Sequence, residues 1–150
     1  MIRPLGPADA AACDAIVASL PDWFGLAEGI RQAAEIVRHH EGYAAELDGT
    51  VIGFLTLDQR HGQSSEISWM AVHRDHRRTG VGAALLRRAT QDLRARDVRV
   101  LVVKTLSDRI DPGPAYAQTR AFYLSEGFVP VLELDIWGPE NPCQVLVLPL

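Results

Sequence analysis

The sequence of 150 residues predicts a single α/β domain, spanning 1–150, in which about four helices flank a mixed β-sheet of about six to seven strands. Three observations predict this fold class. Asp48-Gly49, a pair favoured in tight hairpin turns, separates two apolar runs. A strand, a helix and a strand follow one another between residues 66 and 105, as in a right-handed crossover between parallel strands. Two further apolar runs, 128–134 and 143–150, end the chain.

The first 64 residues predict a strand, two helices, a hairpin and a loop. Pro4 is suited to the edge or the end of a strand. Pro7 is suited to the first turn of a helix, and Pro21 ends that helix. The expected elements are a strand at 1–5, helices at 7–20 and 26–40, hairpin strands within 43–57, and a polar loop at 58–64.

The middle and the end of the chain predict two more helices between strands. Alternation along the strand at 66–72 predicts that Ile67, Trp69 and Ala71 share one face. The helix at about 79–96 has apolar residues spaced three and four apart. The β-branched run at 98–105 is typical of a central parallel strand. A last helix covers 115–126, and Gly127 is suited to its C-terminal cap.

The turn before the third helix has the pattern R-x-x-G-x-G, spelled Arg-Arg-Thr-Gly-Val-Gly at 77–82. Backbone N–H groups at a helix start have no partners within the helix, and the dipole there is positive. Glycine lets a ligand approach the backbone because it has no Cβ. The turn therefore predicts an anion site. The nucleotide-binding patterns G-x-x-x-x-G-K-[ST] and G-x-G-x-x-G do not describe it.

Composition and charge favour a globular protein with one anionic ligand. The chain is 47% hydrophobic and 23% charged, and no run approaches the ~18 apolar residues of a membrane span. The N-terminus does not have the pattern of a signal peptide, so we expect a cytoplasmic protein without membrane contact. Between residues 74 and 104 the chain has nine Lys and Arg but only three Asp and Glu, whereas the rest of the chain is acidic. The acidic remainder suits a cationic substrate.

Nucleic-acid, metal and disulfide sites receive no support from the sequence. The basic segment is short and carries no nucleic-acid-binding signature, so we expect no nucleic acid as partner. His39 and His40 point about 100° apart on a helix and cannot share a metal ion. No other metal-ligand spacing supports a site, so we expect no metal. Cys13 and Cys143 are expected to be small core residues.

The order of elements and three motifs resemble the GNAT superfamily of N-acetyltransferases over essentially the whole chain. Residues 71–86, which include the glycine turn, look like the acetyl-CoA motif of that family. Residues 100–105, Val-Leu-Val-Val-Lys-Thr, look like its strand that splays from a neighbour. Residues 121–128, Ala-Phe-Tyr-Leu-Ser-Glu-Gly-Phe, look like its Y-x-x-x-G-F ending. Many members have asparagine seven residues before that tyrosine, where this chain has Tyr116.

The resemblance implies a GNAT-like fold with a splayed strand pair, and acetyl-CoA as co-substrate. The pyrophosphate of acetyl-CoA is expected over the glycine turn. The pantetheine arm is expected to pair with the open edge of the strand that ends at Val72. The residues expected to bind acetyl-CoA are Met70, Ala71, Val72, Arg77, Arg78, Thr79, Gly80, Val81, Gly82, Ala83 and Thr119.

Two residues are catalytic candidates in this reading. Tyr123 is the tyrosine of the family ending, and its phenol could protonate the leaving sulfur; helix packing is the other explanation for it. Glu66 begins the strand that leads to the turn and could take a proton from the amine, directly or through one water. A solvated glutamate at a strand end is the alternative. The backbone N–H of Val72, or one nearby, is expected to stabilise the oxyanion.

The acceptor is expected to be a primary amine of a small molecule that attacks acetyl-CoA directly in a ternary complex. Trp23, Phe24 and Trp137 are expected to line its pocket, because aromatic rings favour a cation with an apolar body. Two alternatives remain open: an acetyltransferase of protein N-termini or lysines, and an acyl-CoA-binding module without catalysis. Members of the family are often dimers, so a homodimer through the apolar run 145–148 is compatible with the sequence.

Overall fold

The structure is a computed structural model that describes residues 1–23 and 27–150. Its strands are β1 (Ile2–Pro4), β2 (Glu41–Leu47), β3 (Thr50–His61), β4 (Ser64–Val72), β5 (Val100–Leu106), β6 (Val129–Leu134) and β7 (Cys143–Pro149). Its α-helices are α1 (Ala10–Ala18), α2 (Ala27–His39), α3 (Val81–Ala95) and α4 (Pro114–Ser125), and two short 3₁₀ turns are η1 (Pro7–Asp9) and η2 (Arg74–His76).

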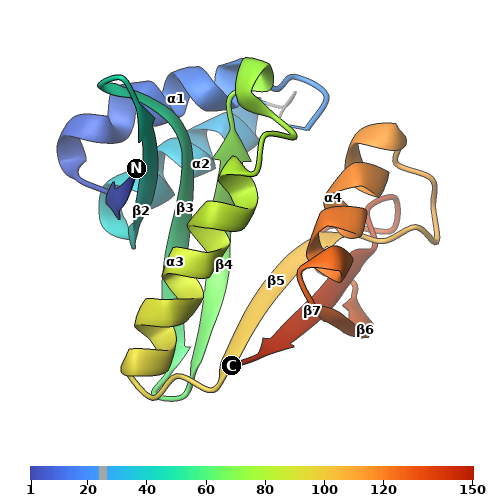
Figure 1. Ribbon diagram of the computed structural model, residues 1–150. Coiled ribbons are helices and arrows are strands. Elements are labelled where there is room, and N and C mark those ends of the chain that lie inside the picture. Colours follow the sequence, from blue (N-terminus) through green and yellow to red (C-terminus); the bar gives the residue numbers. More distant parts are fainter. Residues whose placement is uncertain (24–26) are drawn as a thin grey trace.

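The seven strands form one sheet in the order β1-β2-β3-β4-β5-β7-β6 (Figure 1). Neighbouring strands are antiparallel except β4 and β5, which are parallel. The parallel pair is joined through α3, as the strand–helix–strand pattern predicted. The predicted α/β class, the mixed sheet and the numbers of strands and helices are therefore confirmed for the described part of the chain.

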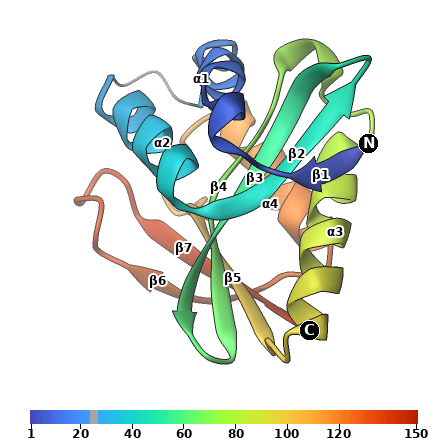
Figure 2. The same cartoon turned by 90° about the vertical axis from the view of Figure 1, so that its left-hand side faces the viewer.

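The helices cover the two faces of the sheet in pairs (Figure 2). The larger core lies between the sheet and the helices α3 and α4. Leu85 and Leu93, which belong to the apolar residues predicted along α3, are fully buried in it. The smaller core lies beneath α1 and α2 and contains Cys13 and Phe54. Among the described residues, no helix is long and apolar enough to cross a membrane.

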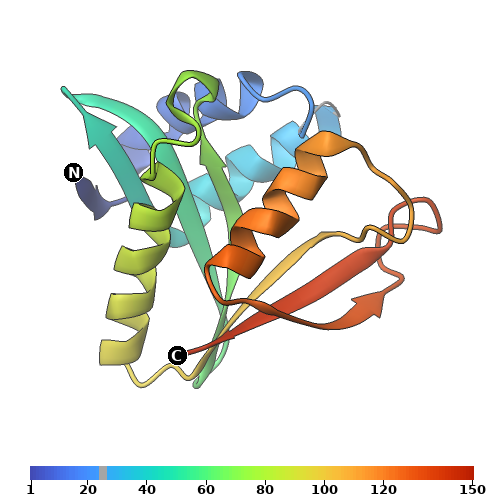
Figure 3. The ribbon, with the colours of Figure 1, turned by 45° about the vertical axis from the view of Figure 1, so that its right-hand side comes forward.

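The sheet opens between β4 and β5. These strands pair over three positions only, Ser64 with Val100, Ser65 with Leu101 and Glu66 with Val102. Beyond that point the two strands diverge, and α4 lies over the half of the sheet that contains β5 (Figures 1 and 3). The splay that the resemblance implied is therefore confirmed, and it leaves the edge of β4 from residue 67 to residue 72 without a β5 partner.

A bulge in β4 overturns the predicted alternation of its side chains. Thr56 of β3 opposes Trp69 and the next residue of β3 opposes Ile67, so Ser68 is an extra residue on β4. Ile67 therefore packs in the core beneath α3, while Trp69 and Ala71 pack against the core beneath α1 and α2. The expectation that all three share a face was wrong. Side chains alternate between the two faces of a strand, so one extra residue moves every later side chain to the opposite face.

The polar segment 58–64, expected to be a loop, is mostly strand. β3 continues to His61 and β4 begins at Ser64, so only a tight turn separates them. Arg60 on β3 forms ion pairs with Asp58, at 3.2 Å, and with Glu66 on β4, at 3.0 Å. Polar residues are compatible with an antiparallel hairpin whose side chains pair across the strands, so polarity did not distinguish a loop here.

Candidate active site

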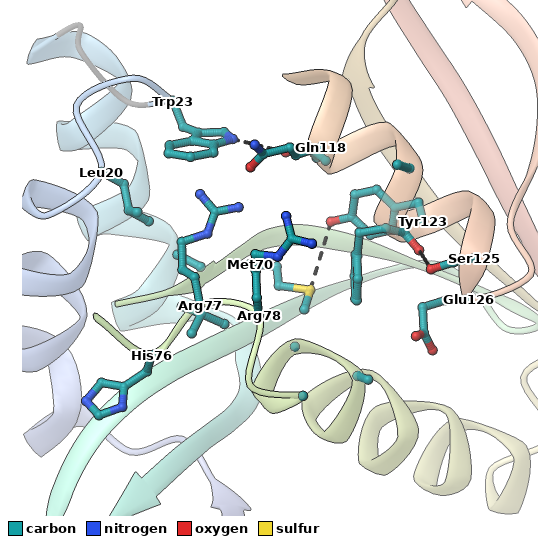
Figure 4. Close-up of a pocket in the computed structure, with 18 residues that line it drawn as sticks. Leu20, Trp23, Met70, His76, Arg77, Arg78, Gln118, Tyr123, Ser125 and Glu126 are labelled. Atoms are coloured by element: carbon teal, nitrogen blue, oxygen red, sulfur yellow. Dashed lines mark hydrogen bonds between the residues drawn. The ribbon is translucent and has the colours of Figure 1, made fainter. Parts of the chain in front are cut away.

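A cavity of about 570 Å³ lies where β4 and β5 diverge, between the start of α3 and the inner side of α4 (Figure 4). Trp23, from the segment after α1, closes one side of it. Nine of the eleven residues predicted to bind acetyl-CoA line this cavity: Met70, Ala71, Val72, Arg77, Arg78, Gly80, Gly82, Ala83 and Thr119. The side chain of Val81 instead packs against the larger core, and the Thr79 hydroxyl donates to the carbonyl of His76.

The turn before α3 presents backbone N–H groups that the helix does not use. The first helical hydrogen bond of α3 runs from the Ala84 N–H to the Gly80 carbonyl, at 3.0 Å, and no side chain in the described part of the chain caps the helix start. Gly80 has a φ of 86°, and Arg78 also lies in the left-handed region, at 61°. A non-glycine residue held at positive φ costs roughly 1–2 kcal/mol, so the surrounding structure imposes this conformation. The turn has the geometry of an anion cradle.

Two guanidinium groups add positive charge to the cradle. Arg77 and Arg78 both line the cavity, and neither forms an ion pair with any residue that the structure describes. Burial lowers the pKa of Arg77, and repulsion from Arg78 lowers it further. The Arg77 guanidinium lies 3.9 Å from the centre of the Trp23 ring. An anion bound at this helix start would relieve the repulsion between the two cations.

The edge of β4 forms a second wall of the cavity. Because its residues from 67 onward have no β5 partner, an extended ligand with amide groups could pair with it as an additional strand does. The opposite wall is close here. A Cβ on Gly82 would lie 3.1 Å from Met70 Cε and 3.4 Å from Phe122 Cζ. Glycine at position 82 therefore keeps the space between α3, β4 and α4 open.

Tyr123 presents a hydroxyl group to this cavity. The side chain is buried, and its ring packs edge-on against Phe122 and Phe128, with ring centres 5.3 and 5.2 Å apart. Among the described residues the hydroxyl donates only to Met70 Sδ, at 3.9 Å, and a thioether sulfur is a weak acceptor. Burial raises the pKa of Tyr123. The phenol therefore keeps its proton at neutral pH, and its weak contact with sulfur leaves the hydroxyl free to donate a hydrogen bond to a stronger acceptor.

Tyr116, which stands where many members of the resembled family have asparagine, has a structural contact. Its hydroxyl donates to the backbone carbonyl of Trp23, at 2.7 Å. The Trp23 indole in turn donates to the Ala115 carbonyl and to the Thr119 hydroxyl oxygen, both at 3.1 Å. These bonds hold Trp23 against α4. Phe24, the other aromatic residue predicted beside it, lies outside the described residues.

Two other predicted site residues lie away from the cavity. Glu66 is at the last position of β4 that pairs with β5, and its two oxygens accept from Arg60 Nε and Lys104 Nζ, each at 3.0 Å. Trp137 lies between β6 and β7 and is 41% exposed. The structure therefore brings Tyr123, Trp23 and the glycine turn together, but not Glu66 or Trp137 with them.

Sequence reasoning missed part of the α4 wall. Gln118, Phe122 and Glu126 line the cavity together with Thr119 and Tyr123. These residues recur at helical spacings of three and four, so the two predicted residues could have identified the rest of that face. Within the described residues, no three His, Cys, Asp or Glu side chains are grouped to hold a metal ion.

Comparison with known proteins places these features in a family. Residues 38–130 match the sequence profile of the acetyltransferase (GNAT) domain. None of the curated protein sequences matches the chain. A protein from Desulfovibrio desulfuricans that is assigned to the GNAT family of acetyltransferases has a similar structure, with 23% identity and a TM-score of 0.85, over 99% of this chain and 98% of that one.

Two other similar structures have different acceptors in their names. An aminoglycoside 6'-N-acetyltransferase complexed with coenzyme A has 13% identity and a TM-score of 0.78, over 99% of this chain and 96% of that one. A ribosomal-protein-alanine N-acetyltransferase from Brucella melitensis has 23% identity and a TM-score of 0.74, over 100% and 99%. At these identities the likeness establishes the fold alone.

Proposed function

Because the chain belongs to the GNAT family of acetyltransferases, which use acetyl-CoA, we propose that it acetylates a primary amine of a small molecule by direct attack in a ternary complex. One observation carries the proposal. The Tyr123 hydroxyl, whose contact among the described residues is with the weak acceptor Met70 Sδ, lies in the same cavity as the guanidinium groups of Arg77 and Arg78. A thioester whose phosphates bind at the turn can therefore place its sulfur near an acid.

The donor is held at three places in this proposal. The N–H groups of residues 81–83 and the guanidinium groups of Arg77 and Arg78 hold the pyrophosphate, which is supported by the uncapped helix start. The free edge of β4 at residues 70–72 pairs with the amides of the pantetheine arm. Thr119 and Tyr123 on α4 face the thioester end.

The chemistry follows from what each side chain can give or take. The acceptor ammonium loses its first proton, and the nitrogen of the neutral amine then forms a bond to the thioester carbon. The carbon–sulfur bond then breaks, and Tyr123 protonates the sulfur as it leaves. The second proton lost by the nitrogen restores the Tyr123 phenol. Glu66 is our candidate to attract the ammonium and take its first proton, although doing so requires the amine to displace Arg60 or Lys104 from a carboxylate oxygen.

A small cationic acceptor is supported by the charge of the chain outside the donor-binding segment. Outside residues 74–104, the chain has sixteen Asp and Glu and six Lys and Arg. Such a surface attracts amines and raises their local concentration. The aromatic residues Trp23 and Trp137 remain our candidates to contact an apolar part of the acceptor. A peptide α-amine has the same reacting group, so experiment must separate the two acceptor classes.

Two measurements on the intact chain test the proposal. At a concentration of 100 times its Kd, acetyl-CoA stabilises a protein by about 2.7 kcal/mol, which raises the melting temperature of a domain of this size by roughly 5–10 °C. Thiol release is then measured over a panel of small amines, polyamines and peptides. We expect a small amine to exceed every peptide at least tenfold in kcat/KM. Preference for a peptide would support the protein acetyltransferase, and a thermal shift without thiol release would support a silent binder; either result contradicts the proposal.

A further inference from the structure

Three polar side chains form a chain of hydrogen bonds next to the opening between β4 and β5. His40, which follows α2, has its Nδ1 2.9 Å from the hydroxyl oxygen of Ser68. That oxygen is 2.9 Å from the hydroxyl oxygen of Thr56. Thr56 is fully buried and lies 3.4 Å from the backbone carbonyl of Trp69. Ser68 is the extra residue of the β4 bulge, which is why its side chain can reach both partners.

Taken as three hydrogen bonds, of which the 3.4 Å contact of Thr56 with Trp69 is the longest, these contacts have one consistent direction. A carbonyl can only accept, so Thr56 uses its single proton to bond to Trp69. Thr56 must then accept from Ser68, which uses its own single proton. Ser68 is left with lone pairs only, so His40 must donate from Nδ1. In this arrangement the neutral imidazole carries its proton on Nδ1 and its lone pair on Nε2.

The free lone pair makes His40 different from the charged residues on the neighbouring strands. On β3, Asp58 pairs with Arg60; on β4, Glu66 pairs with Arg60 and with Lys104 of β5. On α2, His39 pairs with Glu35 at 3.4 Å. His40 forms no ion pair with any residue that the structure describes, and its Nε2 has no hydrogen-bond partner among them. It can accept a proton without breaking an existing pair.

The position of Ser68 links this histidine to the proposed reaction. The pairing of β4 with β5 ends at Glu66, two residues before Ser68. Met70, two residues after Ser68, lines the cavity in which we place acetyl-CoA. Each step of two residues along a strand is about 7 Å. Thr56 lies on the side of the sheet that α1 and α2 cover, since it alternates with Leu55 and Leu57 of the α3 core. An amine that approached β4 from the side of α1 and α2 would meet the face that carries the contact of Ser68 with His40.

We propose that His40 accepts, at Nε2, the proton that leaves the acceptor ammonium, directly or through a water, and then passes it to solvent. Ser68 and Thr56 are positioning residues that fix its tautomer. The ammonium becomes a neutral amine and the imidazole becomes an imidazolium, so one proton moves and no other bond changes. This inference rests on the proposed function, but it gives the first proton of the ammonium to His40 and leaves Glu66 to attract the ammonium, because both Glu66 oxygens are already held by cations.

The tautomer can be tested without any acceptor. The ¹⁵N chemical shifts of the His40 ring at a pH where it is neutral should show a proton on Nδ1 and none on Nε2. In Ser68→Ala the donor bond to the hydroxyl is lost, so the population of the Nε2–H tautomer should increase. A wild-type ring protonated mainly on Nε2 would overturn the inference.

The catalytic role is tested by His40→Gln, with His39→Gln as the matched control. Residue 39 is adjacent and exposed, and among the described residues its one ion pair is with Glu35. A positioned base contributes ~10²–10⁴-fold, so we expect His40→Gln to lower kcat/KM for the amine by about 10²-fold or more. The increase of kcat/KM with pH that reports the imidazole should also disappear, while the acetyl-CoA thermal shift stays as in the wild type. His39→Gln should match the wild type in all three measurements.

The two proposals fail in different ways. If the wild type releases thiol with no amine of the panel, the proposed function is wrong. If the wild type is active and His40→Gln has the rate and the pH profile of His39→Gln, the function stands and the role of His40 is wrong.

Discussion

At the scale of single residues, the hydroxyl of Tyr123 is the group on which the proposed chemistry depends most. Tyr123→Phe keeps the ring contacts with Phe122 and Phe128 and removes only the proton donor. We expect kcat to fall by about 10²-fold, since a positioned acid contributes ~10²–10⁴-fold, with the acetyl-CoA thermal shift unchanged. Steady-state thiol release measures the loss.

Tyr43→Phe is the matched control for that variant, because it also removes the hydroxyl of a buried tyrosine. Tyr43 donates to Asp92, at 2.9 Å, and does not line the cavity. Its variant should keep wild-type kcat. If both variants lose the same activity, the effect of Tyr123 is structural and not chemical. Burial raises the pKa of Tyr123, so kcat should not decline from loss of this acid as the pH rises through the ordinary tyrosine value of about 10.

At the scale of elements, the turn and the first turn of α3 act as one binding unit. In Gly82→Glu, the new side chain would start 3.1 Å from Met70 Cε, and its charge would oppose an anion at the helix start. We expect the thermal shift with acetyl-CoA to disappear. A glutamate in the first turn is compatible with the helix itself, so the melting temperature without ligand should change little.

Gly62→Glu is the control for the glycine substitution. It adds the same side chain and charge in the turn between β3 and β4, where a Cβ meets nothing within 4 Å. Its acetyl-CoA shift should equal that of the wild type. An unchanged shift in Gly82→Glu would show that acetyl-CoA does not bind where we place it.

At the scale of the whole molecule, Arg3 ties the N-terminal strand to the rest of the fold. Its two Nη atoms each donate to a carboxylate oxygen of Asp9, at 2.9 Å, and its Nε donates to Glu46 at 2.7 Å. The N–H of Gly6 also donates to Asp9, at 2.8 Å. Because Asp9 is buried, Asp9→Asn should lower the free energy of unfolding by about 1–3 kcal/mol at neutral pH.

The effect of Asp9→Asn should depend on pH. The bonds from Arg3 lower the pKa of Asp9 in the folded state, so the folded protein binds this proton less readily than the unfolded chain does. The stabilisation is thus complete above the unfolded value of about 3.9, and it is lost as the pH falls through the folded value. Denaturant unfolding from pH 7 to pH 3 should show the wild type and Asp9→Asn converging only at the acidic end.

Asp14→Asn provides the comparison for an exposed pair. Asp14 lies 3.0 Å from Arg38, and their side chains are 42% and 40% exposed. Such pairs contribute about 0–1 kcal/mol, so this variant should be nearly as stable as the wild type at every pH. A loss as large as that of Asp9→Asn would mean that burial of the Arg3 pair is not the reason for its effect.

The edge of the sheet bears on the homodimer that the sequence allowed. The apolar run 145–148 belongs to β7, which lies between β5 and β6 and is paired on both sides. The outer strand is β6, where Val129 and Val131 are exposed. A homodimer stays a prediction, and any pairing of strands at this end of the sheet would involve β6 and not β7.

The sequence by itself determined the order of elements, the glycine turn and most of the residues that line the cavity. Nine of eleven predicted residues line one cavity because the turn and the end of β4 are contiguous in the chain, so local spacing fixes their relative positions. The match of Tyr123 to a family ending added the residue on α4. The same reasoning predicted roles for Glu66 and Trp137 but could not predict how far these residues lie from that cavity.

Only the tertiary structure decided the contacts between distant segments. The bond from Tyr116 to Trp23 and the bond from His40 to Ser68 join residues that no local pattern relates. The bulge at Ser68 depends on how β4 pairs with β3, and a strand's own alternation carries no information about an extra residue in its register. For that reason most of the cavity lining could be predicted from the chain, whereas the contacts of Tyr116 and His40 became visible only when the helices and strands were placed side by side.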